Sequence, residues 1–122
     1  MKKINILICL LLLPVFSSNV LGGELRGTGW LYEGNDGDKK IVLLEKNGTF
    51  IYLNIYSTSG NTGEVFGDGQ DTWKISNGLL VFSFNNGYRI CSFENIHRKV
   101  MSGDCINKQG TVDKNIRLSL IE

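Results

Sequence analysis

The chain has 122 residues, and 13 Lys and Arg against 12 Asp and Glu give it a formal net charge of +1. Two of the basic residues, Lys2 and Lys3, stand at the N-terminus, so 11 basic and 12 acidic residues remain beyond them, a net charge of −1. A domain so close to neutral lacks the basic face that nucleic acid attracts, and the one basic run, residues 97–99, is explained by a solvated turn. We therefore expect no nucleic-acid partner.

The N-terminus reads as an export signal. Lys2 and Lys3 precede an apolar run, residues 4–16, that is shorter than the ~20 residues of a membrane-spanning helix, and small or neutral residues follow it. We expect cleavage after Gly22, which removes Cys9 with the signal peptide (residues 1–22). A single domain of residues 23–122 would then remain, without a membrane anchor, in the periplasm or outside a bacterial cell.

The first predicted strands cover residues 24–32, 39–45 and 49–56, three short runs rich in β-branched, aromatic and aliphatic residues. The third run is apolar on both faces, because Phe50, Tyr52 and Tyr56 alternate with isoleucine and leucine. One of these faces must meet something other than water. Either a neighbouring loop covers it, or it forms a binding surface around Tyr52 and Tyr56.

Residues 57–71 form a long, glycine-rich connection, a kind of loop that often carries function. Within it, Val65 and Phe66 are expected to form a short strand or to dock as a lid. The aspartates Asp68 and Asp71 suggest calcium, as do those of residues 34–38. Neither segment has the ligand spacing of a calcium loop, so we favour ordinary turn chemistry and expect no metal.

Asn-Gly pairs at residues 47–48, 77–78 and 86–87 each stand between predicted strands and are a strong hairpin signal, because both residues tolerate the positive φ of tight turns. A two-residue turn at 77–78 places Ile75 opposite Leu80 and Trp73 opposite Phe82. These four apolar residues then share one face, as expected of a half-buried hairpin.

The turn before Tyr88 has two possible registers. A three-residue loop, 85–87, would place Phe84 opposite Tyr88 and Phe82 opposite Ile90, with Arg89 facing solvent. A two-residue loop would put Arg89 against Phe84 on the buried face. We favour the first register because it buries Tyr88 rather than a charge.

The two cysteines beyond the signal, Cys91 and Cys105, are predicted to form a disulfide, since an even pair in an oxidising compartment is most simply bonded. Closing this loop stabilises a fold by roughly 3 kcal/mol on the chain-entropy model. The alternative is a pair of metal-binding or redox thiols, but neither has CxxC spacing and His97 is the single histidine. If the cysteines face each other, the turn between them centres on residues 97–99.

The last predicted strand covers residues 115–122, where Ile116, Leu118 and Leu120 alternate with polar residues. About eight strands with short links and no helical pattern predict an all-β, antiparallel up-and-down meander that closes into a small barrel. A two-sheet β-sandwich is the alternative.

No constellation of residues predicts catalysis. A nucleophile beside a base, a carboxylate pair in a pocket or a metal cluster is not evident, and no cofactor is expected. We expect a binding protein rather than an enzyme. A small secreted hydrolase, built on carboxylates that meet in space, is the less favoured alternative.

The segments 27–32, 47–50 and 72–78 resemble the small exported bacterial barrels of the lipocalin-like and avidin-like type. The resemblance implies that Trp30 closes one end of the barrel and that a ligand enters the other. The Gly-x-Trp spacing usual in that family is absent, and no biotin site is carried over.

Similar small exported barrels include bacterial inhibitors of proteases and lysozymes, which block an enzyme with a loop or with the N-terminal segment. This resemblance implies a protein partner, reached through residues 57–71 or 23–26. We favour it because large aromatic residues crowd the expected inward face and a barrel of this size has little spare volume. A carrier of a small apolar ligand is the alternative. The residues expected to bind are Trp30, Tyr52, Tyr56, Phe66 and Asp68.

Overall fold

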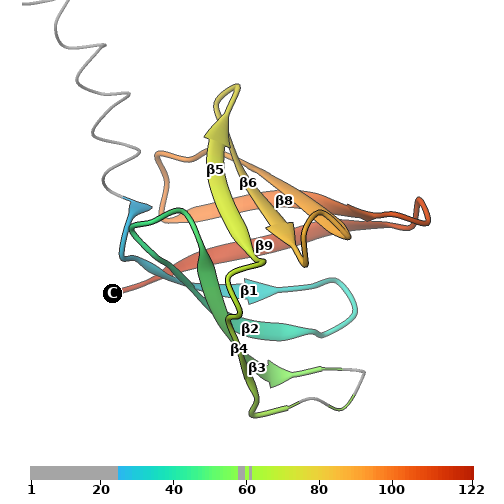
Figure 1. Ribbon diagram of the computed structural model, residues 1–122. Helices are drawn as coiled ribbons and strands as arrows, with labels where there is room; N and C mark the ends of the chain where they lie inside the picture. The colour runs from blue at the N-terminus through green and yellow to red at the C-terminus, as the bar shows by residue number, and fades with distance from the viewer. Residues whose placement is uncertain (1–24, 58–59, 61) are drawn as a thin grey trace, which may run out of the picture.

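The structure, a computed structural model, describes residues 25–57, 60 and 62–122 (Figure 1). The predicted signal peptide and its cleavage site lie outside the described residues. All nine elements are strands: β1 (Gly29–Glu33), β2 (Lys39–Leu44), β3 (Phe50–Tyr56), β4 (Val65–Phe66), β5 (Thr72–Ser76), β6 (Leu79–Phe84), β7 (Arg89–Glu94), β8 (Val100–Asn107) and β9 (Val112–Ile121).

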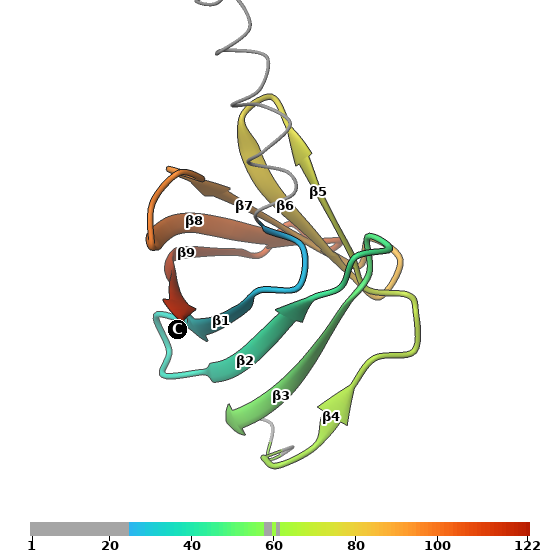
Figure 2. The same ribbon diagram turned by 90° about the vertical axis from the view of Figure 1, so that its left-hand side faces the viewer.

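The strands form one antiparallel sheet in the order β4-β3-β2-β1-β9-β8-β7-β6-β5. Consecutive strands therefore pair with each other, except β4 and β5, and the first strand, β1, pairs with the last, β9. The sheet is strongly curled into a half-barrel, with β3 and β4 on one side and β5 and β6 on the other (Figure 2). This confirms the all-β meander.

The two edges of the curled sheet touch at one place. Thr49 and Thr72 form an isolated bridge, and beside it the N–H of Trp73 donates to the carbonyl of Gly48 at 2.8 Å. Beyond this bridge β3 pairs with the short β4 instead, so Val65 and Phe66 are a strand, one of the two outcomes expected for them. The closure is thus a contact of two corners rather than a continuous ladder.

The first strand begins later than predicted, at Gly29 instead of Glu24, a residue outside the described part. Gly27 has φ +80°, and the N–H of Thr28 donates to the carbonyl of Leu25 at 3.2 Å. This turn lets the Leu25 side chain pack into the core, which a straight strand would not allow. The last strand begins earlier than predicted, at Val112.

The β5–β6 hairpin has the predicted register. Asn77 and Gly78 adopt φ of 53° and 77°, and Trp73 pairs with Phe82 and Ile75 with Leu80. Cys91 pairs with Cys105 as predicted, and their sulfur atoms are bonded. The intervening turn lies between Glu94 and Val100, around the expected residues.

The predicted register of the β6–β7 hairpin is wrong. Phe84 pairs with Arg89, so the loop contains four residues, 85–88, and Tyr88 lies in the turn with 42% of its surface exposed. Arg89 points inward, with its guanidinium carbon 5.5 Å from the centroid of the Phe84 ring. The buried face tolerates this charge because Tyr32 and Asp113 supply acceptors for its N–H groups.

Aromatic rings fill the interior. The Phe50 ring centroid lies 5.0 Å from that of Phe82 and 5.0 Å from that of Phe84, and Phe82 lies 5.2 Å from Phe93. Phe50, Phe82 and Phe93 are 0% exposed. Each such side chain contributes about 1.5–3 kcal/mol by leaving water, so this cluster stabilises the fold.

Candidate functional site

The interior changes from apolar to polar along the strands. Near the start of β1, Trp30 is buried together with Leu25, and its Nε1 donates to Thr28 Oγ1 at 2.8 Å. Farther along, Tyr32 pairs with Lys40 and Lys40 pairs with Asn54, so these three residues form one row across β1, β2 and β3. We call the region formed by Tyr32, Lys40, Asn54, Arg89, Asp38 and Asp113 the charged end.

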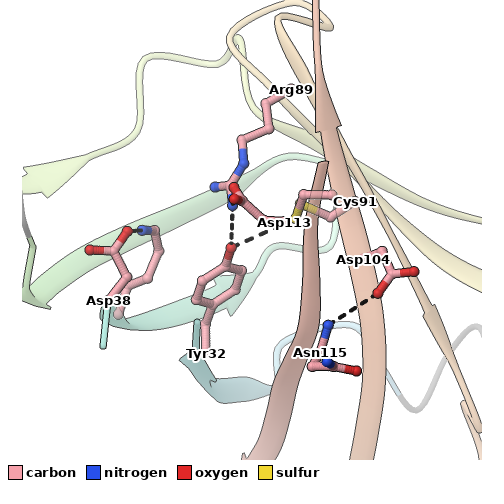
Figure 3. The surroundings of a disulfide bond; sticks show 9 residues. Tyr32, Asp38, Arg89, Cys91, Asp104, Asp113 and Asn115 are labelled. Carbon is pink, nitrogen blue, oxygen red and sulfur yellow. Dashed lines mark hydrogen bonds and ion pairs between the residues drawn. A yellow bond between two sulfur atoms is a disulfide. The ribbon is translucent and has the colours of Figure 1, made fainter. Parts of the chain in front are cut away.

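Arg89 joins the charged end from β7. Its Nη2 donates to Tyr32 Oη at 2.8 Å and to Asp113 Oδ2 at 3.1 Å (Figure 3). The guanidinium carbon also lies 5.9 Å from the centroid of the Tyr32 ring. Both of these hydrogen bonds come from one nitrogen, and Arg has five N–H donors. Arg89 therefore keeps donor capacity toward the outside of the half-barrel, where its side chain is 22% exposed.

Tyr32 is fully buried beneath Arg89. Burial raises the pKa of Tyr32 to about 12, and the nearby Arg89 guanidinium opposes this rise. The phenol is therefore neutral over the physiological range. Its oxygen also lies 3.7 Å from Cys105 Sγ, which connects the charged end to the disulfide.

Lys40 is 6% exposed, an unusual position for an ammonium group. Its Nζ lies 3.8 Å from Asp38 Oδ2 and faces the rings of Tyr32 and Tyr52 at 4.9 and 5.5 Å from their centroids. Burial lowers the pKa of Lys40, and Asp38 opposes the shift. Opposite it, the buried Oδ1 of Asn54 has no hydrogen-bond partner among the described residues. Within the part of the chain that the structure describes, this acceptor of the charged end thus lacks a donor.

The β1–β2 loop, residues 34–38, borders the charged end. Its short-range hydrogen bonds include those from the Gly34 N–H to the Asp38 carbonyl at 2.7 Å, from the Gly37 N–H to the Gly34 carbonyl at 3.2 Å and from the Asp38 N–H to Asp36 Oδ1 at 3.0 Å. Between this loop and Tyr32, Arg89 and Asp113 lies a pocket of about 210 Å³. Charges of both signs line it, which suits a polar group better than an apolar one.

The residues predicted to bind are dispersed. Tyr52 points inward beside Lys40, and Phe66 stacks on it with ring centroids 5.1 Å apart. Tyr56 is 52% exposed and lies against Gly37 of the β1–β2 loop. Trp30 is buried at the opposite end, and the exposed Asp68 accepts the Gln70 N–H at 3.0 Å within its own turn. Only Tyr52, Phe66 and Tyr56 therefore adjoin the charged end.

The second face of β3 is partly covered. Leu53 pairs with Val65 of β4, and Gly67 packs so closely on Ile51 that an added Cβ would collide with its side chain. Ile55, on the same face at the end of the strand, stays exposed. Loop cover thus explains one part of this face and leaves the part nearest the charged end uncovered.

Sequence reasoning missed Tyr32, Lys40, Asn54, Arg89 and Asp113. One signal was available, since Lys40 alternates in phase with Val42 and Leu44, both of which a half-buried strand directs inward. A second signal was the two-residue loop considered before Tyr88, which places Arg89 against Phe84 on the buried face. Asn54 and Asp113 carried no such signal.

The disulfide lies at the wall of the charged end, with both cysteines buried. A bonded pair is consistent with an oxidising compartment. In the described residues no helix is long and apolar enough to span a membrane. The same part of the chain contains no group of three or more side chains placed to hold a metal ion.

Comparison of the chain with protein-family models, with curated proteins and with solved structures finds no match in any of the three.

Proposed function

We propose that the chain is an exported, non-enzymatic binding module that recognises another protein through its charged end. The observation that carries this proposal is the contrast between an interior packed with aromatic rings and one end lined with charged and hydrogen-bonding groups. Export and cleavage after Gly22 belong to the proposal, and the disulfide supports an oxidising destination.

The packed interior argues against a carrier of apolar molecules. Phe50 contacts Phe82 and Phe84 at centroid distances of 5.0 Å, at the place where a lipocalin-like carrier would hold its ligand. A small barrel has little volume to spare once such rings occupy it.

The rim of the charged end resembles a protein contact surface in composition. Tyr56 and Tyr88 are 52% and 42% exposed, and Arg89 lies next to Tyr88 in the chain. Tyrosine and arginine are enriched where proteins bind one another, because they combine apolar area with directed hydrogen bonds. The pocket beside Arg89 is about the size of one inserted side chain.

The curled antiparallel sheet is compatible with a lipocalin-like barrel, and we include that relationship in the proposal. It accounts for the buried Trp30 at one end and the polar opening at the other. Among similar small barrels, the inhibitors of proteases and lysozymes are the better functional parallel, because they use the rim of the barrel rather than its interior.

The test uses residues 23–122 with the disulfide intact. Immobilised protein is exposed to the exported proteins of the source cells, and we expect one protein to be retained in equimolar amount. Arg89→Gln and Tyr56→Ala should weaken retention, whereas Arg98→Gln in the β7–β8 turn serves as the matched control. Circular dichroism of each variant establishes that the sheet is intact.

A second measurement distinguishes a protein-binding module from the alternative, a carrier of apolar molecules. An apolar naphthalene dye is titrated while the emission of Trp30 and Trp73 is followed, and we expect no saturable change. Saturable, equimolar dye binding without any retained protein would contradict the proposal and favour the apolar carrier.

A further inference from the structure

The free edge of β5 offers backbone groups to a further strand. The Trp73 N–H donates to the Gly48 carbonyl, on the side of β5 away from β6. In an antiparallel pair, the N–H and carbonyl groups of successive residues point alternately toward the paired strand and away from it. The N–H and carbonyl of Ile75, two residues after Trp73, therefore also point away from β6. β5 is the last strand of the sheet, and beyond the Thr49–Thr72 bridge no strand of the described residues pairs with this side of it (Figure 1).

A cleft of about 340 Å³ lies along this edge. It opens where the β2–β3 turn diverges from β5 after the Thr49–Thr72 bridge. Its lining includes Arg26, Lys46, Gly48, Trp73, Lys74 and Ile75. The Trp73 ring is fixed by a hydrogen bond from its Nε1 to the Glu45 carbonyl at 2.9 Å, so one wall of the cleft is rigid.

Three cations surround the cleft without a carboxylate among its lining residues. Arg26, Lys46 and Lys74 are all exposed, and none takes part in the ion pairs of the described chain. They come from the turn before β1, from the β2–β3 turn and from β5. The fold thus gathers positive charge beside the β5 edge, one of the two edges of the sheet.

We propose that an extended, acidic segment of a protein partner adds to the free edge of β5. The backbone of that segment would pair with Ile75, and its carboxylates would meet Arg26, Lys46 and Lys74. This inference rests on the proposed protein-binding function and adds to it a second contact surface with a defined partner chemistry.

A second copy of the chain is the less suitable occupant. Pairing two β5 edges would bring two identical clusters of three cations together, and like charges oppose such a contact. Lysine on an edge strand commonly prevents self-association. The same charge admits a strand of opposite sign.

The probe is a labelled peptide of about eight residues that alternates glutamate with valine, as a strand with one charged face requires. Its fluorescence anisotropy is measured with the disulfide-bonded chain of residues 23–122. We expect saturable binding, no binding of the matching lysine–valine peptide, and weaker binding when salt rises from about 0.05 to about 0.5 M. Equal binding of both peptides would overturn the proposal.

Charge-reversal variants locate the site. Lys46→Glu and Lys74→Glu should each weaken peptide binding about tenfold, because an attraction becomes a repulsion. Lys108→Glu, an exposed lysine in the β8–β9 turn, is the matched control and should bind as the unaltered chain does. Weakening by Lys108→Glu to the same degree would show a diffuse charge effect and overturn the site.

Backbone pairing is tested separately from charge. A glutamate–valine peptide N-methylated at alternate residues cannot pair along that edge and should not bind, and the bound unmodified peptide should slow hydrogen exchange of the Ile75 amide. Equal binding of the methylated peptide would overturn strand addition. Sedimentation should show that the chain is monomeric. Dimers that become more abundant in Lys74→Glu would instead identify a second copy of the chain as the occupant of the β5 edge.

The outcomes also separate the two proposals. Arg89→Gln should leave peptide binding unchanged, because Arg89 belongs to the charged end and not to the β5 cleft. Loss of peptide binding alone overturns only the β5 proposal. Dye binding without protein retention overturns the proposed function, whatever the peptide does.

Discussion

Arg89 Nη2 donates a hydrogen bond to Tyr32 Oη at 2.8 Å and thereby joins β7 to β1, two strands that do not pair with each other in the sheet. The donor lies on the rim and the acceptor is fully buried. A charged group thus lies at the polar end of a half-barrel whose remaining core is aromatic and aliphatic. Several consequences can be measured on residues 23–122 by urea denaturation.

The Arg89–Tyr32 bond should contribute more than the Arg89–Asp113 ion pair. In double-mutant cycles with Arg89→Gln, Tyr32→Phe and Asp113→Asn, we expect a coupling of about 1.5–3 kcal/mol with Tyr32, as for a hydrogen bond to a charged group. The coupling with Asp113 should be below about 1 kcal/mol, since that pair is largely exposed. The reverse order would contradict the role assigned to Tyr32.

Stability should fall at high pH because Tyr32 must then ionise inside the protein. Its pKa is about 12 in the folded state against 10.0 for a solvated tyrosine, so the folded state holds the proton more tightly. The resulting stabilisation is complete below pH 10 and is lost as pH rises through 12, a change on the order of 3 kcal/mol. Tyr32→Phe should remove this part of the decline, and an unchanged slope would contradict it.

Replacing Lys40 by an apolar residue of similar length should stabilise the fold. Burial lowers the pKa of Lys40, so the charged form is disfavoured in the folded state and its penalty is greatest at neutral pH. We expect Lys40→Met to raise the unfolding free energy at pH 7 by about 1 kcal/mol, as for other poorly paired buried charges. Lys39→Met, on the exposed side of β2, is the control and should be near neutral; a loss of stability in Lys40→Met would show that its contact with Asp38 dominates.

Removing the disulfide should cost a large share of the stability. Cys91 and Cys105 are 14 residues apart in sequence, and opening so short a loop costs roughly 3 kcal/mol on the chain-entropy model. The Cys91→Ser, Cys105→Ser variant should therefore unfold at lower urea concentration, with the same denaturant dependence. Reductant should have the same effect on the unaltered chain and none on the variant; a variant as stable as the oxidised chain would contradict the estimate.

Local sequence specified the hairpins whose turns have a single solution. Asn77-Gly78 allows a two-residue turn, and with it the pairing of Trp73 with Phe82 follows from alternation alone. The pairing of Cys91 with Cys105 is likewise local, because one short turn connects their strands. These features depend on backbone conformations and side-chain periods that operate over a few residues.

The register of the β6–β7 hairpin could not be predicted from local sequence. Asn85, Asn86 and Gly87 all adopt positive φ, and neighbouring residues allow more than one loop length. The register that turns Arg89 inward is favourable because Tyr32, 57 residues away in sequence, and Asp113, 24 residues away, supply its acceptors. Considered without those partners, a buried arginine is correctly disfavoured.

The charged end likewise depends on contacts between residues that are far apart in the sequence. Tyr32, Lys40 and Asn54 are neighbours across three strands, and Arg89 reaches them because the sheet curls until β7 faces β1. The curl also brings Phe50 of β3 against Phe82 and Phe84 of β6, contacts between strands that do not pair in the sheet. Alternation and turn chemistry thus specified an antiparallel all-β chain with its disulfide, whereas long-range packing determined which polar groups it buries together.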